Sequence, residues 1–365
     1  MDVLLFDMDG VLIRPLGYHY ALKETVRLAG VSTGFGKVKL TDEQIAQFEA
    51  LGISCEWHSS ALCMAMMVLN NYRGITGEDI NSQLRPLNLN ELFEELAIQP
   101  ISTPALKRGI NAIEKISNEF GGLRDSPRRL VAESESIHHS PTMNWFQELI
   151  LGSERFNKIY QKQSQLETES YLELYDRSLL SKEYARKLIH WATEEIHGAA
   201  IMTNRPSGNS IGYEGIPDAK LGAELVGLES LPLIGLGEIS WLANQTGGDI
   251  GDLLKPSLTH SLFTILVASG WSLEKTIEKI IPGENVLRAD ELLHLKNSRI
   301  TVFEDTPGGL VSVDSAAAWF NEFGLGIDIQ KKGIAEDKLK SLALSENGAQ
   351  IYSNVNQALS SLDDF

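Results

Sequence analysis

The sequence has little of what marks secreted, membrane-spanning or zinc-finger proteins. Its 365 residues include two cysteines, Cys55 and Cys63, and neither belongs to a CxxC pair. We therefore expect reduced, buried thiols rather than a disulfide framework or a zinc site. No uncharged apolar stretch approaches the roughly 18 residues of a membrane-spanning helix. The first apolar run, VLLF, meets Asp7 after four residues and is too short for a signal peptide. These absences predict a soluble, cytoplasmic protein with no membrane partner.

Positive charge is also scarce in this chain. There are 32 Lys and Arg residues against 49 Asp and Glu residues, which gives a formal net charge of -17. Such a balance argues against a protein that binds nucleic acid or anionic membranes. It does not exclude a small anionic substrate, because the pocket for that substrate can be locally positive. The oligomeric state stays open.

Apolar residues are plentiful enough for packed cores. They make up 43% of the chain, so neither disorder nor low complexity is indicated. At about 150 residues per domain, the length of the chain suggests two domains.

Short apolar runs predict a parallel sheet. They lie at residues 2–6, 199–202, 231–236, 300–303 and, more weakly, 350–353. Helical patterns occupy residues 218–227, 259–268, 272–281, 308–322 and 335–342, between or beside the later runs. This alternation favours an α/β fold with a doubly wound, Rossmann-like parallel sheet.

The segment between the first two predicted strands has a different pattern. It contains amphipathic stretches at residues 41–51, 59–71, 104–120, 142–163 and 181–193, with no convincing strand. Breaks at residues 99–104 and 124–129 are typical of loops. We therefore expect residues 1–15 and 191–365 to form the α/β core, and residues 16–190 to form an inserted helical domain.

Polar residues follow the predicted strands at one edge of the sheet, where open α/β folds bind their ligands. The candidates are Asp7, Asp9, Thr203, Asn204, Glu304 and Asp305, together with Lys255 in the sequence LLKPSL. Two carboxylates directly after a buried strand are costly unless they are paired or bound to a metal. Carboxylates, a hydroxyl and an ammonium group together suit phosphoryl transfer through an aspartyl phosphate, with Mg²⁺ held by carboxylate oxygens.

These residues occur in four motifs that resemble those of the haloacid dehalogenase (HAD) superfamily. LLFDMDGVL is similar to its first motif, which implies that Asp7 is the nucleophile and Asp9 the general acid/base. IMTNRP resembles the second motif, which implies that the Thr203 hydroxyl and the backbone N–H of Asn204 bind phosphate.

The third and fourth motifs extend the resemblance. LLKPSL is similar to the third motif, with Lys255 as the phosphate-binding lysine. VFEDTPGGL resembles the fourth motif as it occurs in the phosphoglycolate phosphatase and β-phosphoglucomutase branch, with Glu304 and Asp305 at the magnesium. The implied metal set is Asp7, Asp9, Asp305 and Glu304. The helical insert lies where this family carries a C1-type cap domain.

The resemblance implies a Mg²⁺-dependent phosphatase, a phosphoric monoester hydrolase that acts on a small phosphorylated metabolite through an aspartyl-phosphate intermediate. Asp9 argues against a haloacid dehalogenase, because the resemblance implies that such an enzyme lacks this second aspartate. A phosphomutase would use the same residues, and a non-catalytic binding or regulatory protein on the same scaffold is a further alternative. The sequence does not identify the substrate.

Four other sites allow two interpretations each. Arg14 could contact a substrate anion or form an ordinary salt bridge. Residues 56–58, Glu-Trp-His, could form a substrate-reading loop, although the start of a helix is the interpretation that we favour. For His138 and His139, we expect a polar loop rather than a ligand role. Arg128 and Arg129 are expected in a solvated turn rather than in a phosphate clamp.

Overall fold

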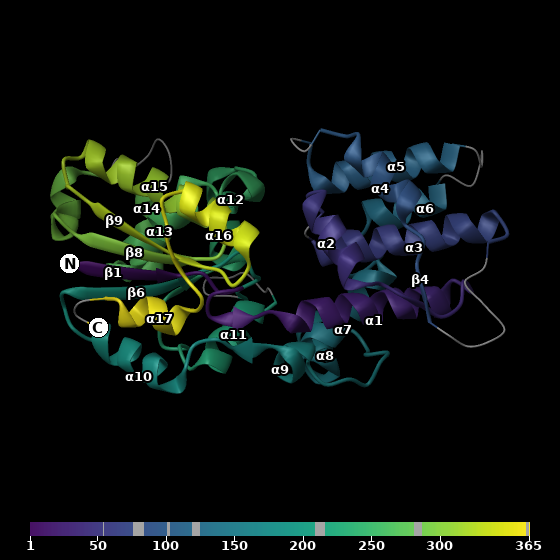
Figure 1. Cartoon of the computed structure of the whole chain (residues 1–365), viewed down its shortest axis with the longest axis horizontal. Helices are drawn as coiled ribbons and strands as arrows, with labels where there is room; N and C mark the ends of the chain where they lie inside the picture. Colours follow the sequence, from purple (N-terminus) through teal and green to yellow (C-terminus); the bar gives the residue numbers. More distant parts are fainter. Residues whose placement is uncertain are drawn as a thin grey trace. The chain divides into compact units, whose positions relative to one another are not determined.

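The computed structural model describes residues 1–53, 55–75, 84–100, 103–118, 125–208, 216–280, 287–362 and 365. The chain divides into two compact units. Met1–Pro15 and Asp176–Phe365 form the first, called the sheet unit here, and Leu16–Tyr175 form the second, called the helical unit (Figure 1). The second boundary thus lies at residues 175–176, before the expected position at 190. Residues 182–191 belong to the sheet unit because Ala185, Leu188 and Trp191 pack into its core.

The sheet unit contains a six-stranded parallel sheet in the order β10-β9-β8-β1-β6-β7. Its strands are β1 (Asp2–Phe6), β6 (His197–Met202), β7 (Leu233–Ile234), β8 (Arg299–Glu304), β9 (Asp328–Ile334) and β10 (Gln350–Tyr352). A separate antiparallel pair joins β2 (Ile13–Arg14) to β5 (Arg177–Ser178). The chain therefore leaves and re-enters this unit at neighbouring positions.

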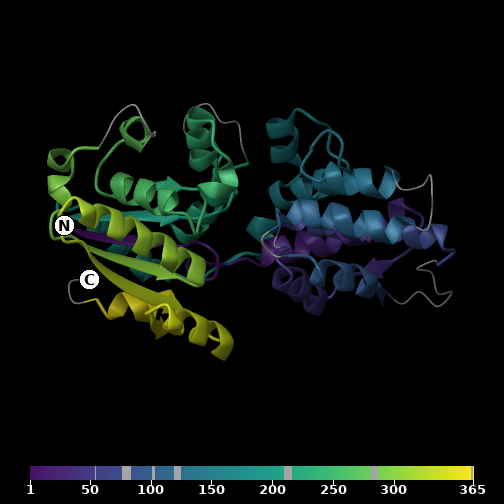
Figure 2. The same ribbon diagram turned by 90° about the horizontal axis from the view of Figure 1, so that it is seen from above.

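Helices cover both faces of the sheet, which confirms the predicted α/β fold (Figures 1 and 2). The helical elements of this unit are α10 (Lys182–Trp191), α11 (Asp218–Val226), α12 (Leu236–Thr246), α13 (Leu258–Ala268), α14 (Leu273–Ile280), α15 (Pro307–Glu322), α16 (Lys338–Glu346) and α17 (Val355–Ser360), with 3₁₀ turns η2 (Ile250–Asp252) and η3 (Ala289–Leu295). Alternation along β1 explains the two layers. Val3 and Leu5 pack with α13 and α15, while Leu4 and Phe6 pack with α10, α11 and α17.

The sheet differs from the sequence prediction at two places. Strand β9 was not expected, because its sequence DIQKKGI carries two lysines in a row. Lys332 is nevertheless buried, since its ammonium group contacts Gln350, Tyr352 and Ser361. The predicted strand at 231–236 is shorter than expected. Its last residue begins α12, where Glu238 accepts a hydrogen bond from the backbone N–H of Gly235.

The helical unit is built around α3 (Glu56–Tyr72), which is buried around most of its circumference. The helices that surround it are α1 (Leu16–Ser32), α5 (Ala105–Ser117), α6 (Asp125–Ala132) and α7 (Pro141–Leu151). The others are α2 (Asp42–Ala50), α4 (Asn90–Ala97), α8 (Ser153–Tyr160) and α9 (Tyr171–Tyr175). This content agrees with the helical insertion that the sequence predicts.

Three expectations for the insert were wrong in detail. Residue 124 of the predicted loop at 124–129 lies outside the described residues, and residues 125–129 belong to α6, which tolerates Pro127 because a proline in the first turn costs no hydrogen bond. The stretch at 142–163 forms two helices, separated at Gly152, whose φ of 79° ends α7. A two-residue strand pair also occurs, between β3 (Val38–Lys39) and β4 (Arg85–Pro86). Residues 101–102 and 119–120 lie outside the described residues.

Within the described parts of the chain, we find no helix whose length and apolar character would allow it to cross a membrane. Both cysteines are free thiols. Cys63 is buried and Cys55 is half-buried, and burial raises the pKa of both, to about 12 for Cys55.

Candidate active site

The central strand β1 places Asp7 at the carboxyl edge of the sheet. Its last residue, Phe6, is in register with Phe303 of β8 on one side and with Ile201 of β6 on the other. The phenyl rings of Phe6 and Phe303 stack with their centroids 4.5 Å apart. Because the three strands end at the same level, the residues that follow them converge at this edge.

Lys255 lies at the centre of the resulting cluster. Its Nζ is 2.5 Å from Asp7 Oδ1, 2.6 Å from Glu304 Oε1 and 3.1 Å from the Met202 carbonyl oxygen. The side chain is only 8% exposed. Burial by itself would lower the pKa of Lys255, but the negative charges of Asp7 and Glu304 outweigh it and raise the pKa above its ordinary value. Lys255 is therefore a firmly charged cation beside two carboxylates.

Glu304 is the most enclosed member of the cluster, with no exposed surface. Its Oε2 accepts hydrogen bonds from the backbone N–H of Asp305 at 3.1 Å, from the backbone N–H of Thr306 at 3.2 Å and from the Thr306 hydroxyl at 3.1 Å. Its other oxygen receives Lys255. These contacts fix Glu304 as the group that orients the lysine toward Asp7.

Burial raises the pKa values of two carboxyl groups in the cluster. Burial, followed by the charge of Glu304, raises the pKa of Asp7 well above its usual range, although Lys255 lowers it. Burial also raises the pKa of Asp305 to about 6, against the lowering effect of Lys340. Lys340, from α16, contacts Asp305 Oδ2 and was not foreseen from the sequence. Added positive charge at this edge would favour the ionised form of both aspartates.

The donor set of this cluster fits a hard divalent cation. Asp7, Glu304 and Asp305 each offer a carboxylate oxygen, and these atoms lie within 4.8 Å of one another in the described chain. Mg²⁺ is bound by few protein carboxylates together with water and substrate oxygens. Asp7 and Asp305 are the better placed ligands, because both oxygens of Glu304 already accept hydrogen bonds.

The carboxylate of Asp9 does not join this cluster. It faces Arg205, whose Nε is 3.0 Å from Asp9 Oδ1 and 2.9 Å from Oδ2, and whose Nη2 is 2.6 Å from Oδ1. Arg205 Nη2 also lies 3.1 Å from Asp176 Oδ2, and both of these side chains are almost fully buried. Arg205 was missed in the sequence analysis, although it follows Thr203 and Asn204 in the motif TNRP.

The other phosphate-binding candidates follow β6. Thr203 is buried, and its hydroxyl accepts a hydrogen bond at 3.1 Å from the backbone N–H of Arg205. Asn204 is exposed. The structure therefore groups Asp7, Lys255, Glu304 and Asp305 by direct contact, and places Thr203 and Asn204 after the neighbouring strand.

Several secondary candidates acquire ordinary partners. Arg14 lies 3.6 Å from Glu336, with both side chains exposed. Residues 56–58 form the first turn of α3, and His58 Nε2 lies 2.8 Å from Glu135 Oε1. His139 lies 3.2 Å from the Ser136 hydroxyl oxygen. Arg128 contacts Glu114 from helix α6, rather than from the expected turn.

Two adjacent glycines provide a test of how tightly the cluster is packed. A Cβ at Gly309 would lie 1.7 Å from Glu304 Oε1, whereas a Cβ at Gly308 would meet only Pro256, at 3.8 Å. We expect Gly309→Ala to displace Glu304, to cost about 1–3 kcal/mol of unfolding free energy and to lower any turnover by about 10²-fold. Gly308→Ala should be neutral or slightly stabilising. Urea denaturation and turnover assays of both variants check this, and equal effects would contradict the packing argument.

The fold has counterparts among solved structures. A crystal structure from the Northeast Structural Genomics Consortium matches with a TM-score of 0.59 and 14% identity, over 100% of this chain and 99% of that chain. The phosphatase Tt82 from Thermococcus thioreducens matches with a TM-score of 0.42 and 14% identity, over 94% and 99%. No protein-family model and no curated protein matches the sequence. At 14% identity the first likeness concerns the fold alone, and at a TM-score of 0.42 the second does not establish even a shared fold.

Proposed function

We propose that the protein is a Mg²⁺-dependent phosphatase of the haloacid dehalogenase type that hydrolyses small phosphorylated metabolites. The observation that carries the proposal is the contact between Asp7 Oδ1 and Lys255 Nζ at 2.5 Å, next to Glu304 and Asp305. A carboxylate nucleophile needs nearby positive charge to approach an anionic phosphoryl group. Lys255 and a cation held by Asp7 and Asp305 would provide this positive charge at one place.

In the proposed first step, a carboxylate oxygen of Asp7 attacks phosphorus and the bond from phosphorus to the substrate oxygen breaks. Asp9, which enters this step protonated, gives its proton to that leaving oxygen. Lys255 and the Thr203 hydroxyl hold the phosphoryl oxygens, with the backbone N–H of Asn204. Asp7 and Asp305 would hold Mg²⁺, which would supply further positive charge for the transfer.

In the second step, Asp9 removes a proton from a water molecule whose oxygen attacks the phosphorus of the aspartyl phosphate. The acyl phosphate bond breaks, Asp7 is regenerated and inorganic phosphate is released. Arg205 has a positioning role here, since it holds the Asp9 carboxylate with three contacts of 2.6–3.0 Å.

The substrate class follows from how deeply the nucleophile lies. The side chains of Asp7 and Lys255 are only 10% and 8% exposed. A phosphate carried on a small molecule can reach such a recess more readily than one on a folded protein. We therefore expect phosphorylated sugars, acids or nucleotides to exceed phosphoproteins in kcat/KM, and a phosphoprotein preferred over every metabolite would overturn this part of the proposal.

The decisive assay measures inorganic phosphate released from a panel of phosphorylated metabolites. We expect activity with Mg²⁺, its loss in excess EDTA and its return when Mg²⁺ is added back. Asp305→Ala should raise the Mg²⁺ concentration needed for half-maximal activity more than Glu304→Ala does. Full activity in excess EDTA would contradict the proposal. Transfer to a sugar hydroxyl without free phosphate would instead indicate a phosphomutase.

A second prediction concerns Asp9. We expect Asp9→Asn to lower turnover of alkyl phosphates by about 10²–10⁴-fold, because the amide cannot protonate the leaving oxygen. An aryl phosphate such as p-nitrophenyl phosphate needs less protonation, so its burst of phosphoenzyme formation should be affected less. The comparison is made by rapid-quench kinetics on both substrates. Equal losses on both would argue against a general-acid role.

A further inference from the structure

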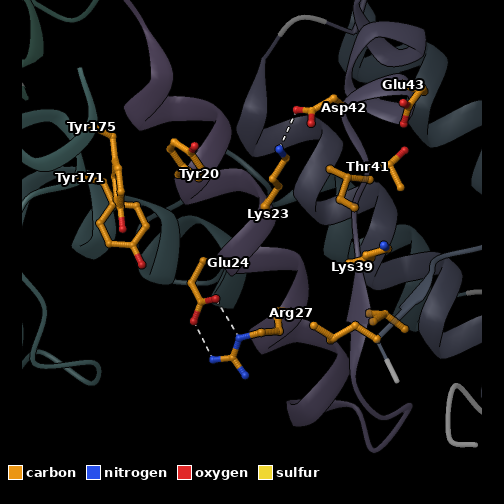
Figure 3. Close-up of a pocket in the computed structure, with 13 residues that line it drawn as sticks. Tyr20, Lys23, Glu24, Arg27, Lys39, Thr41, Asp42, Glu43, Tyr171 and Tyr175 are labelled. Atoms are coloured by element: carbon orange, nitrogen blue, oxygen red, sulfur yellow. Dashed lines mark hydrogen bonds and ion pairs between the residues drawn. The ribbon is translucent and has the colours of Figure 1, made fainter. Parts of the chain in front are cut away.

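A pocket in the helical unit is not used by the proposed phosphatase chemistry. It has a volume of about 590 Å³, within the range of small-molecule sites. Its walls come from α1, from β3 with the start of α2, and from α9. In Figure 3, Tyr171 and Tyr175 lie on one side, Lys39 and Thr41 on the other, and Tyr20 and Lys23 between them.

Three tyrosines form a continuous aromatic wall in this pocket. The rings of Tyr20 and Tyr175 have centroids 4.4 Å apart, and those of Tyr171 and Tyr175 have centroids 4.9 Å apart. Tyr20 is 43% exposed, so part of its side chain is open to a ligand, although Lys23 Nζ lies over its ring, 5.6 Å from the centroid. A flat or chair-shaped ring is the shape that packs against such a wall.

The charges in the pocket are balanced. Lys23 Nζ lies 2.6 Å from Asp42 Oδ1. Arg27 forms two hydrogen bonds to Glu24, of 2.8 Å and 2.6 Å. Both of these cations already face a carboxylate, so neither provides net charge for a phosphate.

The remaining wall also disfavours an anion. The start of α2 is closed by a capping box, in which Thr41 and Gln44 exchange hydrogen bonds. Asp42 and Glu43 follow in its first turn, so negative charge stands where an anion would approach the helix. Lys39 and Glu43 are exposed and line the pocket. Lys39 can donate hydrogen bonds to a ligand, and Glu43 can accept them. The polar groups of the pocket thus offer donors and acceptors in equal measure.

We propose that this pocket binds a neutral polyhydroxylated ring, of the chemical class of a monosaccharide. The apolar C–H face of such a ring packs on Tyr20 and Tyr175, while its hydroxyls donate to carboxylates and accept from Lys39. Hydrogen bonds to charged side chains are the stronger kind, and each hydroxyl can make both types. This site is separate in its residues from the proposed phosphatase site and does not depend on it.

The test uses the intact chain and four probes: glucose, galactose, mannose and N-acetylglucosamine. Saturation-transfer NMR and titration should detect saturable binding of at least one at millimolar concentration. Tyr20→Ala should weaken it by about fivefold or more, since a ring contact is lost. Tyr72→Ala is the matched control, because Tyr72 is 45% exposed, lies in the same unit and does not line the pocket.

A second pair of variants examines the polar rim. Lys39→Gln should weaken binding of the sugar, whereas Lys37→Gln, two residues away and also exposed, should not. Asp7→Asn should leave sugar binding unchanged whether or not it abolishes phosphatase activity. The proposal is overturned if no sugar binds saturably, if Tyr20→Ala has no effect, or if adenosine or inorganic phosphate binds at these residues more tightly than every sugar.

Discussion

Asp7→Asn is expected to reduce phosphatase turnover by about 10⁴-fold or more, because an amide cannot form the aspartyl phosphate. The two side chains have the same shape, so the fold should persist. The pKa of Asp7 is raised in the folded protein, first by burial and then by the charge of Glu304. A raised carboxyl pKa means that ionisation of Asp7 costs folding free energy at pH values above its unfolded pKa. A neutral asparagine removes that cost, so the free energy of unfolding at pH 7 should be unchanged or higher.

The measurement combines phosphate release on the best metabolite with thermal unfolding. Asp2→Asn is the matched control, since Asp2 begins the same strand at its opposite end and is in register with His197 and Arg299. It should leave turnover within a factor of two of the unmodified protein. Retention of even a tenth of normal turnover by Asp7→Asn would remove Asp7 from the role of nucleophile.

Lys255→Met is the second change with a large expected effect. The variant leaves the buried carboxylates of Asp7 and Glu304 without the ammonium group that now lies 2.5–2.6 Å from each. Removing one partner of a buried ion pair costs about 3–5 kcal/mol, because the remaining charge is uncompensated. We expect a loss of stability of that order at pH 7, together with loss of phosphatase activity.

Lys340→Met provides the comparison for stability. Lys340 also contacts a carboxylate of the cluster, that of Asp305, but its side chain is 36% exposed. Its removal should cost less than about 1 kcal/mol, as for partly solvated ion pairs. Urea denaturation of both variants measures the difference. If Lys255→Met were no more destabilising than Lys340→Met, the central position of Lys255 in the cluster would have to be abandoned.

Much of the fold could be predicted because local sequence patterns carry the information. The apolar run of β1 and the alternation of helices with strands in the second half indicate a parallel α/β sheet without reference to distant residues. Helix starts are equally local: Ser181, Ser257 and Asp337 each accept a hydrogen bond from the next turn. The four motifs also lie at strand ends or helix starts that such patterns predict.

Elements that depend on distant partners could not be predicted. Strand β9 pairs with β8 and β10, and its Lys332 can be buried there because the ammonium group reaches Ser361, 29 residues away. No pattern within DIQKKGI reveals these partners. The boundary at residue 176 depends on β5 pairing with Ile13 and Arg14, and on the packing of α10 against the core. In both cases, the stabilising contact joins parts of the chain whose proximity is a result of folding.

The sequence by itself determined which chemical groups could be present at the edge of the sheet: two aspartates after β1, the glutamate that ends β8 and the aspartate that follows it, and Lys255. Only the tertiary structure decided which of these charged groups contact one another. Lys255 contacts Asp7 across 248 residues, while Asp9 faces Arg205 across 196 residues and lies outside the cluster. The physical reason is that the partners of a buried ion pair depend on the distance between the charged groups and on their burial. Both are set only when the strands have aligned, so the local sequence does not reveal them.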